Sequence, residues 1–328
     1  MILTRAPFRI PLGGGGTDLP SYYSKYGGFI FSATINKYMY ICINRPAADD
    51  LIRIKYSKSE TIDSIKEIKH ELVRESLRHT GIKDNIEIAS MADVPAGTGL
   101  GSSGSYLVGL LKGLHELKRE NISTQELAEE ACRIEIDILK KPVGKHDKYL
   151  AAFGGFTVMD IDKDGKVKVS RANLSRDIIE ALENKLVLYF TGVSRDSSTI
   201  LSEQNAQAKI KESEVAKCLT RIKEIGMEIR DSLEKGDLRN FGILMDEHWQ
   251  TKKRMSNKIS NPKIDNLYEL AKKNGVLGGK IMGAGGGGFF LFCCEGDKKK
   301  LRQVMAKTGL KEMPFNFDLE GSKVLVNF

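Results

Sequence analysis

Glycine is gathered into three short clusters, and this distribution constrains the fold of the chain more than any other feature. The 328 residues include 32 glycines, roughly a tenth of the chain against a usual share of about 7%. The clusters are Gly13–Gly16, then Gly97, Gly99, Gly101 and Gly104, and finally Gly283 with Gly285–Gly288. Each adjoins an apolar strand or helix pattern instead of the polar sequence of a flexible linker. Because glycine costs conformational entropy, the clusters predict loops in which the backbone approaches another group closely.

The central cluster lies between a predicted strand and a predicted helix. Ile86–Ser90 has strand character, and Ser102 and Ser103 open a helical pattern that runs to Arg119. A glycine-rich turn followed by a helix N-terminus directs backbone N–H groups at one point, as a nucleotide phosphate requires. A hydroxyl in the first turn also suits the magnesium ion that accompanies a nucleotide. The alternative is a serine-capped loop that binds nothing.

Two better-known nucleotide motifs do not fit. A Walker loop needs G-x-x-x-x-G-K-[ST], but the segment from Gly275 to Lys280 has another spacing and is followed by Ile281. A dinucleotide fold needs G-x-G-x-x-G at the start of a long helix, but the first cluster has Asp18 at the third glycine position.

Composition excludes several classes of protein. A chain of this length favours two domains, and 41% hydrophobic with 29% charged residues excludes a mainly disordered chain. The longest apolar stretches, such as Phe289–Cys294, are far below the roughly 20 residues that span a bilayer, and the N-terminus lacks a signal pattern. The scattered cysteines favour reduced thiols in a cytoplasmic protein and no zinc site; they are Cys42, Cys132, Cys218, Cys293 and Cys294.

The net charge of +8, from 51 basic and 43 acidic residues, does not by itself indicate a nucleic-acid partner. The runs Lys252–Arg254 and Lys298–Lys300 lie in helical patterns and are predicted to be solvated helix faces. No aromatic RNA-binding motif or zinc finger accompanies them. The excess suits an anionic small substrate equally well.

Hydrophobic periodicity predicts mixed α/β layers in two domains, residues 1–180 and 181–328. The predicted strands are Tyr38–Asn44, Ile52–Tyr56, Ile86–Ser90, Phe156–Asp160, Lys185–Thr191, Gly288–Cys294 and Lys323–Phe328. The predicted helices are Asp63–His79, Ser103–Arg119, Thr124–Lys140, Ile200–Leu233, Leu238–Arg254, Lys263–Asn274 and Lys298–Thr308.

In this order and spacing, the three clusters resemble the motifs of the GHMP kinase superfamily across almost the whole chain. Pro95–Ser103 matches the central Pro-x-x-x-Gly-Leu-Gly-Ser-Ser motif at every defined position. The N-terminal motif Pro7–Leu19 is most similar to that of the anomeric sugar kinases, first the D-glycero-D-manno-heptose 7-phosphate kinase group and then the L-fucose kinases. The resemblance implies an α+β fold, with an N-terminal domain like domain 2 of ribosomal protein S5 and a ferredoxin-like C-terminal domain.

The resemblance also assigns catalytic and metal-binding roles. Asp147 aligns with the catalytic aspartate, Arg9 with the basic residue beside it, and Glu135 with the magnesium-binding glutamate. Pro142 and Gly144 interrupt the chain between the two carboxylates, so that Asp147 can return to the cleft. Without the motif, both carboxylates would be ordinary surface residues and Arg9 an ordinary strand-edge arginine.

The remaining assignments concern the nucleotide and the sugar. ATP binding is expected at Pro95, Ala96, Gly97, Thr98, Gly99, Leu100, Gly101, Ser102 and Ser103, with Mg²⁺ held by Ser103 and Glu135. Sugar binding is expected at Gly14, Gly15, Gly16, Thr17, Asp18 and Gly286, with Arg195 as a candidate for a substrate phosphate.

One departure from the family pattern flanks the catalytic position, where His146 and Lys148 replace the common glutamines. Positive charge on these residues would favour the ionised form of Asp147. The two side chains are expected to face solvent, and the alternative is that they contact a sugar phosphate.

The resulting hypothesis is an ATP- and magnesium-dependent kinase of the anomeric hydroxyl of a heptose 7-phosphate, acting in nucleotide-sugar biosynthesis. The alternatives are a kinase of a neutral sugar such as L-fucose, and a sensor of the same fold that binds nucleotide and sugar without turnover. No nucleic-acid or membrane partner is expected, and a homodimer is left open.

Overall fold

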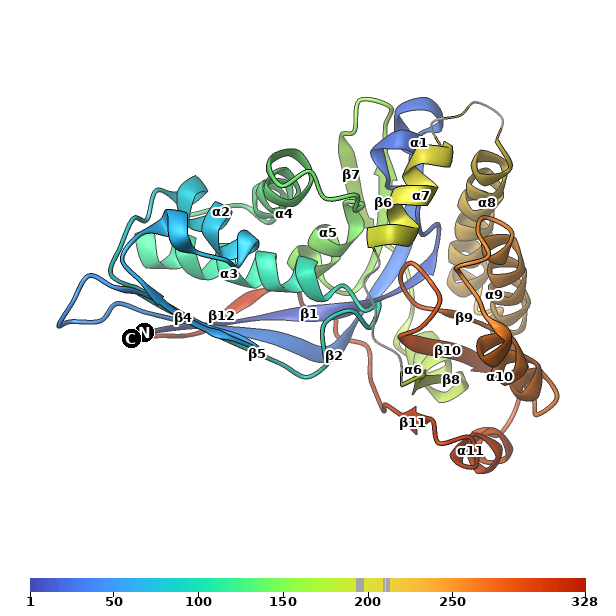
Figure 1. Cartoon of the computed structure of the whole chain (residues 1–328). Helices are drawn as coiled ribbons and strands as arrows, with labels where there is room; N and C mark the ends of the chain where they lie inside the picture. The colour runs from blue at the N-terminus through green and yellow to red at the C-terminus, as the bar shows by residue number, and fades with distance from the viewer. Residues whose placement is uncertain (193–197, 209, 211–212) are drawn as a thin grey trace.

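A long sheet of eight strands dominates one end of the molecule (Figure 1). The computed structural model describes residues 1–192, 198–208, 210 and 213–328. The strands of this sheet are β1 Ile2–Gly13, β2 Gly28–Asn44, β3 Ile52–Lys55, β4 Ser59–Ile62, β5 Ile86–Ala92, β6 Phe156–Ile161, β7 Val167–Arg171 and β12 Lys323–Asn327. Their main order is β12-β1-β2-β5-β3-β4, with β6 pairing with both β2 and β7. All pairs are antiparallel except β3 with β5, which are parallel.

Helices cover one face of this sheet (Figure 1). They are α2 Glu71–Thr80, α3 Ser102–Lys118, α4 Thr124–Cys132 and α5 His146–Phe153, and a π-helical turn, Arg133–Ile138, follows α4. Gly109 and Gly113 of α3 face β1 and β2, because a Cβ on Gly113 would lie 2.7 Å from Ile43. Helix α3 therefore lies close against the sheet, which fixes the position of its N-terminus.

A second, antiparallel sheet lies at the other end of the chain (Figure 1). Its order is β11-β8-β10-β9, with bounds β8 Leu186–Phe190, β9 Val276–Ile281, β10 Phe289–Cys294 and β11 Lys311–Glu312. The other helices are α1 Pro20–Tyr26, α6 Arg176–Lys185, α7 Ser198–Ala208, α8 Glu214–Glu234, α9 Leu238–Lys253, α10 Pro262–Lys272 and α11 Lys298–Ala306. Helix α9 packs on β9, and α8 packs against both α9 and the first two strands of the long sheet.

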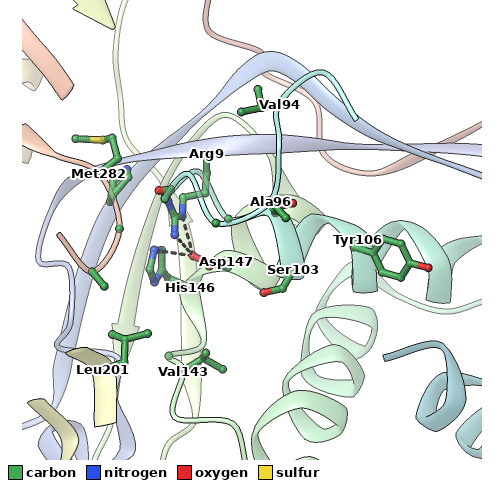
Figure 2. Close-up of a pocket in the computed structure, with 18 of the residues that line it drawn as sticks. Arg9, Val94, Ala96, Ser103, Tyr106, Val143, His146, Asp147, Leu201 and Met282 are labelled. Atoms are coloured by element: carbon green, nitrogen blue, oxygen red, sulfur yellow. Dashed lines mark hydrogen bonds and ion pairs between the residues drawn. The ribbon is translucent and has the colours of Figure 1, made fainter. Parts of the chain in front are cut away.

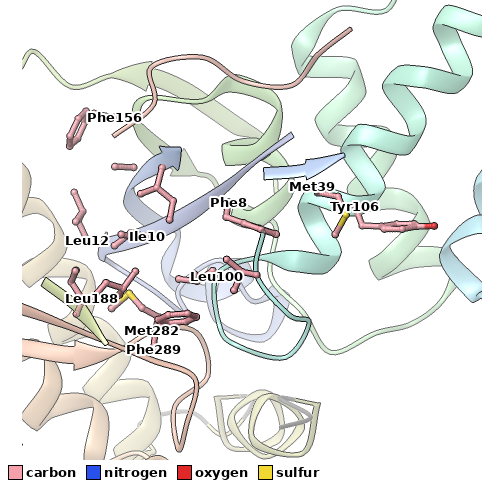
Figure 3. Close-up of a cluster of buried hydrophobic side chains, with 14 of the residues drawn as sticks. Phe8, Ile10, Leu12, Met39, Leu100, Tyr106, Phe156, Leu188, Met282 and Phe289 are labelled. Atoms are coloured by element: carbon pink, nitrogen blue, oxygen red, sulfur yellow. The ribbon is translucent and has the colours of Figure 1, made fainter. Parts of the chain in front are cut away.

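One apolar core joins the two sheets. Figure 3 shows Phe8, Ile10 and Leu12 of β1 in the same buried cluster as Leu188 and Phe289 of the second sheet. The strand β1 therefore contributes to the interface between the halves of the molecule as well as to its own sheet. The last strand, β12, pairs with β1, so residues 323–327 return to the first sheet. The division into residues 1–180 and 181–328 stays a prediction. That division assigns residues 323–327 to the second domain, whereas β12 belongs to the first sheet.

Several predicted elements are shorter or divided in the structure. The segment Asp63–His79 contains only a 3₁₀ turn, Ile65–Glu67, and then α2. The segment Ile200–Leu233 contains α7 and α8. The predicted helix Thr124–Lys140 changes to π-helical geometry after Cys132 and ends at Ile138. In the first and third of these segments, apolar spacing continues through a local change of backbone, which periodicity does not detect.

Two strands that adjoin glycine clusters, β1 and β9, were not predicted. The strand β1 contains Pro7 and Pro11, and its register with β2 shifts next to each of them, as expected where a proline cannot donate to the ladder. The strand β9 contains Gly278 and Gly279, which lack strand propensity. A Cβ on Gly278 would lie 2.1 Å from the carbonyl oxygen of Gly242 on α9, so that close packing requires glycine.

In the part of the chain that the structure describes, every helix is too short or too polar to cross a bilayer.

Candidate active site

A cavity of about 860 Å³ brings the three glycine clusters together. Its lining includes Gly15 and Gly16 of the first cluster, Gly97, Gly99 and Gly101 of the second, and Gly283, Gly285 and Gly287 of the third. The second and third clusters touch directly, because a Cβ on Gly99 would lie 2.4 Å from the carbonyl oxygen of Met282. The surplus glycine is therefore used where separate loops meet around one cavity.

The N-terminus of α3 faces this cavity. Gly101 is the N-cap residue in the left-handed conformation, with φ of 86°, and without a side chain it cannot cap the N–H groups of the first turn. Ser102 and Ser103 of that turn line the cavity, and the Ser103 side chain is exposed to it. Free N–H groups at a helix N-terminus suit the phosphates of a nucleotide.

Asp147 lies in the same cavity, held by Arg9 (Figure 2). The Nε of Arg9 donates to Asp147 Oδ1 at 2.7 Å, and Nη2 lies 2.5 Å from the same oxygen. The Nη1 of Arg9 donates to the carbonyl oxygen of Gly99 at 2.6 Å. Gly104 makes this arrangement possible, since a Cβ there would lie 2.6 Å from the Cβ of Asp147. One arginine thus connects the glycine-rich loop Pro95–Ser103 to Asp147.

His146 bridges Asp147 and Asp18. Its Nδ1 lies 2.7 Å from Asp18 Oδ2, and its Nε2 lies 2.8 Å from Asp147 Oδ1. The backbone N–H of His146 also donates to Asp18 Oδ2 at 3.0 Å. Asp18 and Asp147 therefore share one histidine. The solvent-facing expectation for His146 is wrong, since its side chain is only 13% exposed.

These contacts set the ionisation of all three side chains. Burial alone would raise the pKa of Asp147, but Arg9 and His146 hold that pKa well below its usual range. Burial disfavours protonated His146, but Asp147 and Asp18 outweigh it and raise the pKa of His146 to about 9. The pKa of Asp18 is lowered by His146 against the effect of burial. At neutral pH the network holds two carboxylates and two cations.

Glu135 is placed differently from the expectation for a magnesium ligand. Its Oε2 lies 2.5 Å from Nζ of Lys148, and both side chains are buried. Burial alone would lower the pKa of Lys148, but the charge of Glu135 outweighs this effect, so the pKa of Lys148 is raised. Neither residue lines the cavity. The expectation that Lys148 faces solvent is wrong, because Lys148 is 1% exposed. Ser103 is the predicted metal ligand that the structure places at the cavity, and the role of Glu135 stays a prediction.

Comparison with known proteins decides the family. The model for the GHMP kinases N terminal domain matches residues 63–155, and the model for GHMP kinases C terminal matches residues 229–311. The D-glycero-alpha-D-manno-heptose 7-phosphate kinase of Campylobacter jejuni is 30% identical over 98% of this chain and 98% of its own length. This chain belongs to the GHMP kinase family.

Solved structures of GHMP kinases share the fold. A D-glycero-D-manno-heptose 1-phosphate kinase from Bacteroides thetaiotaomicron has a TM-score of 0.80 at 27% identity and covers 100% of both chains. Galactokinase from Lactococcus lactis, complexed with galactose, has a TM-score of 0.77 at 19% identity and covers 98% of this chain and 94% of its own. The expected α+β, two-domain GHMP kinase fold is confirmed, and the protein is an ATP-dependent phosphotransferase acting on a sugar hydroxyl.

Some predicted site residues of this GHMP kinase do not line the cavity. The Thr17 hydroxyl lies 2.8 Å from the carbonyl oxygens of both Gly14 and Phe29 and so holds the loop Gly13–Gly16 in shape. The N–H of Gly286 donates to the carbonyl oxygen of Ile259. Buried Thr98 and Leu100 support the loop Pro95–Ser103 from inside. The lining contains Asp18, Pro95 and Ala96 but not Gly14, Thr17, Thr98, Leu100 or Gly286. Arg195 is outside the described residues.

An aromatic end of the cavity was not predicted. His70 stacks on Tyr106, with ring centroids 4.9 Å apart, and the edge of Tyr56 meets His70 at 4.7 Å. Met91 and Val94 line the same cavity. The three rings come from the N-cap of α2, from α3 and from the residue after β3, so no local pattern could have grouped them.

A basic wall was also missed. Lys252 and His248 of α9 and Lys280 of β9 line the cavity and are buried. The prediction of a solvated Lys252–Arg254 face is wrong for Lys252. The available signal was periodicity, because Lys252 follows Trp249 by three residues and Met245 by seven, on the buried face of the helix.

Proposed function

We propose that this GHMP kinase transfers the γ-phosphoryl group of ATP to the anomeric hydroxyl of D-glycero-D-manno-heptose 7-phosphate, giving the 1,7-bisphosphate for nucleotide-sugar biosynthesis. The observation that carries the proposal is ionised Asp147, bound by Arg9 between the sugar loop and the phosphate loop. The choice of sugar is supported by the 30% identity to the Campylobacter jejuni enzyme over nearly all of both chains.

The acceptor hydroxyl lies next to Asp147 in the proposed complex. Because the pKa of Asp147 is held low, the carboxylate is a weak base that orients the hydroxyl and takes its proton late. The sugar oxygen forms a bond to the γ-phosphorus as the bond to the β-phosphate oxygen breaks, and the electron pair leaves with ADP. Such a loose transition state demands positioning and charge stabilisation more than a strong base, and Arg9 supplies a fixed positive charge.

The nucleotide occupies the α3 side of the cavity. Its phosphates meet the uncapped N–H groups of the first turn, and its base lies against the aromatic cluster of His70, Tyr106 and Tyr56, which suits a purine. Magnesium, bound with the nucleotide, would neutralise charge on the phosphates. Ser103 would hold the ion, since Mg²⁺ commonly takes few protein ligands together with phosphates and water.

The test measures ADP production by purified protein with heptose 7-phosphate, mannose, galactose and L-fucose. Heptose 7-phosphate is expected to give the highest kcat/KM. Asp147→Asn should lower kcat by roughly 10²–10⁴-fold with little change in nucleotide affinity, while Asp160→Asn, on an exposed strand position, should not. Preference for a neutral sugar would overturn the choice of substrate, and full activity of Asp147→Asn would overturn the catalytic role.

A further inference from the structure

Three basic side chains form one wall of the cavity, and they are buried more deeply than basic residues usually are. Lys280, His248 and Lys252 are 2%, 2% and 7% exposed. His248 and Lys252 lie one helical turn apart on α9, and Lys280 lies on the neighbouring strand β9. All three line the cavity.

No carboxylate balances this wall among the described residues. The Nζ of Lys280 donates to the carbonyl oxygen of Leu12 at 2.7 Å, and the Nζ of Lys252 donates to that of Gly283. Neither lysine has an ion-pair partner in the part of the chain that the structure describes. Lys148 provides the contrast within the same protein, because it is equally buried and is paired with Glu135 at 2.5 Å.

His248 adds an unsatisfied polar group. Both ring nitrogens are buried, and within the described residues neither has a hydrogen-bond partner. Burial, with Lys280 and Lys252 nearby, lowers the pKa of His248 well below its usual range, so the ring is neutral. A neutral imidazole offers one donor and one acceptor. A buried group of this kind costs free energy unless a ligand satisfies it.

The electrostatics of the wall favour an anion. Burial and the charge of Arg9 lower the pKa of Lys252 to about 7, and burial, Lys252 and Arg9 lower that of Lys280. A positive charge on one of these groups therefore disfavours a positive charge on the others in a region shielded from water. A bound anion with two negative charges would reverse this repulsion and accept several hydrogen bonds.

The position of the wall indicates which substrate carries that anion. Leu12, which accepts from Lys280, immediately precedes the first glycine cluster. In Figure 2, Met282, which follows β9, lies on the opposite side of Asp147 from Tyr106, the aromatic end that suits the base. The α3 N-terminus already supplies donors for the nucleotide phosphates. The wall therefore belongs to the acceptor side of Asp147.

We propose that Lys252, Lys280 and His248 form a subsite for a phosphate ester carried by the acceptor sugar, remote from the hydroxyl that reacts. This inference rests on the proposed function and deepens it, since it assigns the residues that select a sugar phosphate over a neutral sugar. With a neutral sugar, Lys252 and Lys280 lack an anionic partner and the ring nitrogens of His248 stay unsatisfied. Discrimination therefore comes from this penalty as well as from the attraction to a phosphate.

The experiment compares paired acceptors, D-glycero-D-manno-heptose with and without its 7-phosphate and mannose with and without a 6-phosphate. Wild type, Lys252→Met, Lys280→Met and His248→Leu are assayed for KM and kcat with each acceptor and for KM of ATP. Lys253→Met is the matched control, because Lys253 is the next residue of α9 but pairs with Asp265 at 3.1 Å. Thermal unfolding is followed for every variant.

Each lysine variant is expected to raise KM for the phosphorylated acceptor at least tenfold while KM for ATP stays within twofold and Tm does not fall. Lys253→Met should behave as wild type. An increase confined to KM for ATP would overturn the proposal and assign the wall to the terminal phosphate of the nucleotide. Unchanged KM for both substrates would overturn it as well.

The failure of this inference can be distinguished from the failure of the proposed function. If wild type phosphorylates heptose 7-phosphate and the variants keep its KM, the subsite is wrong and the function stands. If wild type rejects heptose 7-phosphate but prefers mannose 6-phosphate over mannose, with KM sensitive to Lys252→Met, the function is wrong and the subsite stands. Preference for the unphosphorylated member of both pairs overturns both.

Discussion

The Nε of Arg9 donates to Oδ1 of Asp147 at 2.7 Å across 138 residues of sequence. The same guanidinium reaches the carbonyl oxygen of Gly99 in the phosphate loop. Arg9 therefore fixes two parts of the active site relative to each other and keeps Asp147 ionised. A lysine would keep the charge but not these three directed contacts.

Arg9→Gln is expected to lower kcat by roughly 10²–10³-fold. Without the charge of Arg9, less counteracts the effect of burial, and the pKa of Asp147 rises. The acid limb of the kcat/KM profile therefore moves to higher pH. Arg9→Lys should give a smaller loss and a smaller shift. The pH–rate profiles of the three proteins check this, and an unchanged acid limb in Arg9→Gln would contradict it.

Two neighbouring glycines separate a structural from a binding role. Gly14 has φ of +78° and a Cβ there would lie 1.9 Å from the carbonyl oxygen of Phe29, whereas a Cβ on Gly15 meets nothing within 4 Å. Gly15, unlike Gly14, lines the cavity. Gly14→Ala should lower the free energy of unfolding by more than about 2 kcal/mol. Gly15→Ala should change it by less than about 0.5 kcal/mol but raise KM for the sugar on the order of tenfold. Urea denaturation and steady-state kinetics decide, and equal destabilisation by both would refute the distinction.

His146 makes the stability of the protein depend on pH. Its pKa is raised from 6.5 to about 9 in the folded protein, so the folded state binds the proton more tightly. This stabilisation is complete below about pH 6.5 and is lost as the pH rises through about 9, with a maximum of about 3 kcal/mol. The free energy of unfolding of His146→Gln should differ from wild type most at pH 6 and little above pH 9. Parallel curves from pH 6 to pH 10 would show that folding does not raise the pKa of His146.

The buried pair of Glu135 and Lys148 tests the assignment of the magnesium ligand. In EDTA, Glu135→Gln should lower the free energy of unfolding by about 3–5 kcal/mol, because it leaves the buried Lys148 ammonium without a partner. Adding Lys148→Met should recover much of that loss, as a double-mutant cycle would show. If Glu135 acts only as a metal ligand, the single variant will keep its stability in EDTA and change only the magnesium dependence of activity.

The motifs identified the residues around the cavity more reliably than the elements that carry them. Much of the Pro95–Ser103 motif, predicted to bind phosphate, lines the cavity. The strand β1, which carries Arg9, was not predicted because Pro7 and Pro11 interrupt the strand pattern. Short-range patterns detect a loop with a required backbone geometry. They do not detect a strand that tolerates proline through shifts of register.

Sequence alone determined the three glycine loops, their order, and the alignment of Arg9 and Asp147 with a kinase motif, because these depend on local backbone geometry and residue identity. Tertiary structure decided which charges meet. Lys252 and Lys253 are identical neighbours on α9, yet one is buried beside the cavity and the other pairs with Asp265 near the surface. Charge state and partner depend on what lies across the interface between the two sheets, and that neighbour is specified only when distant segments pack together.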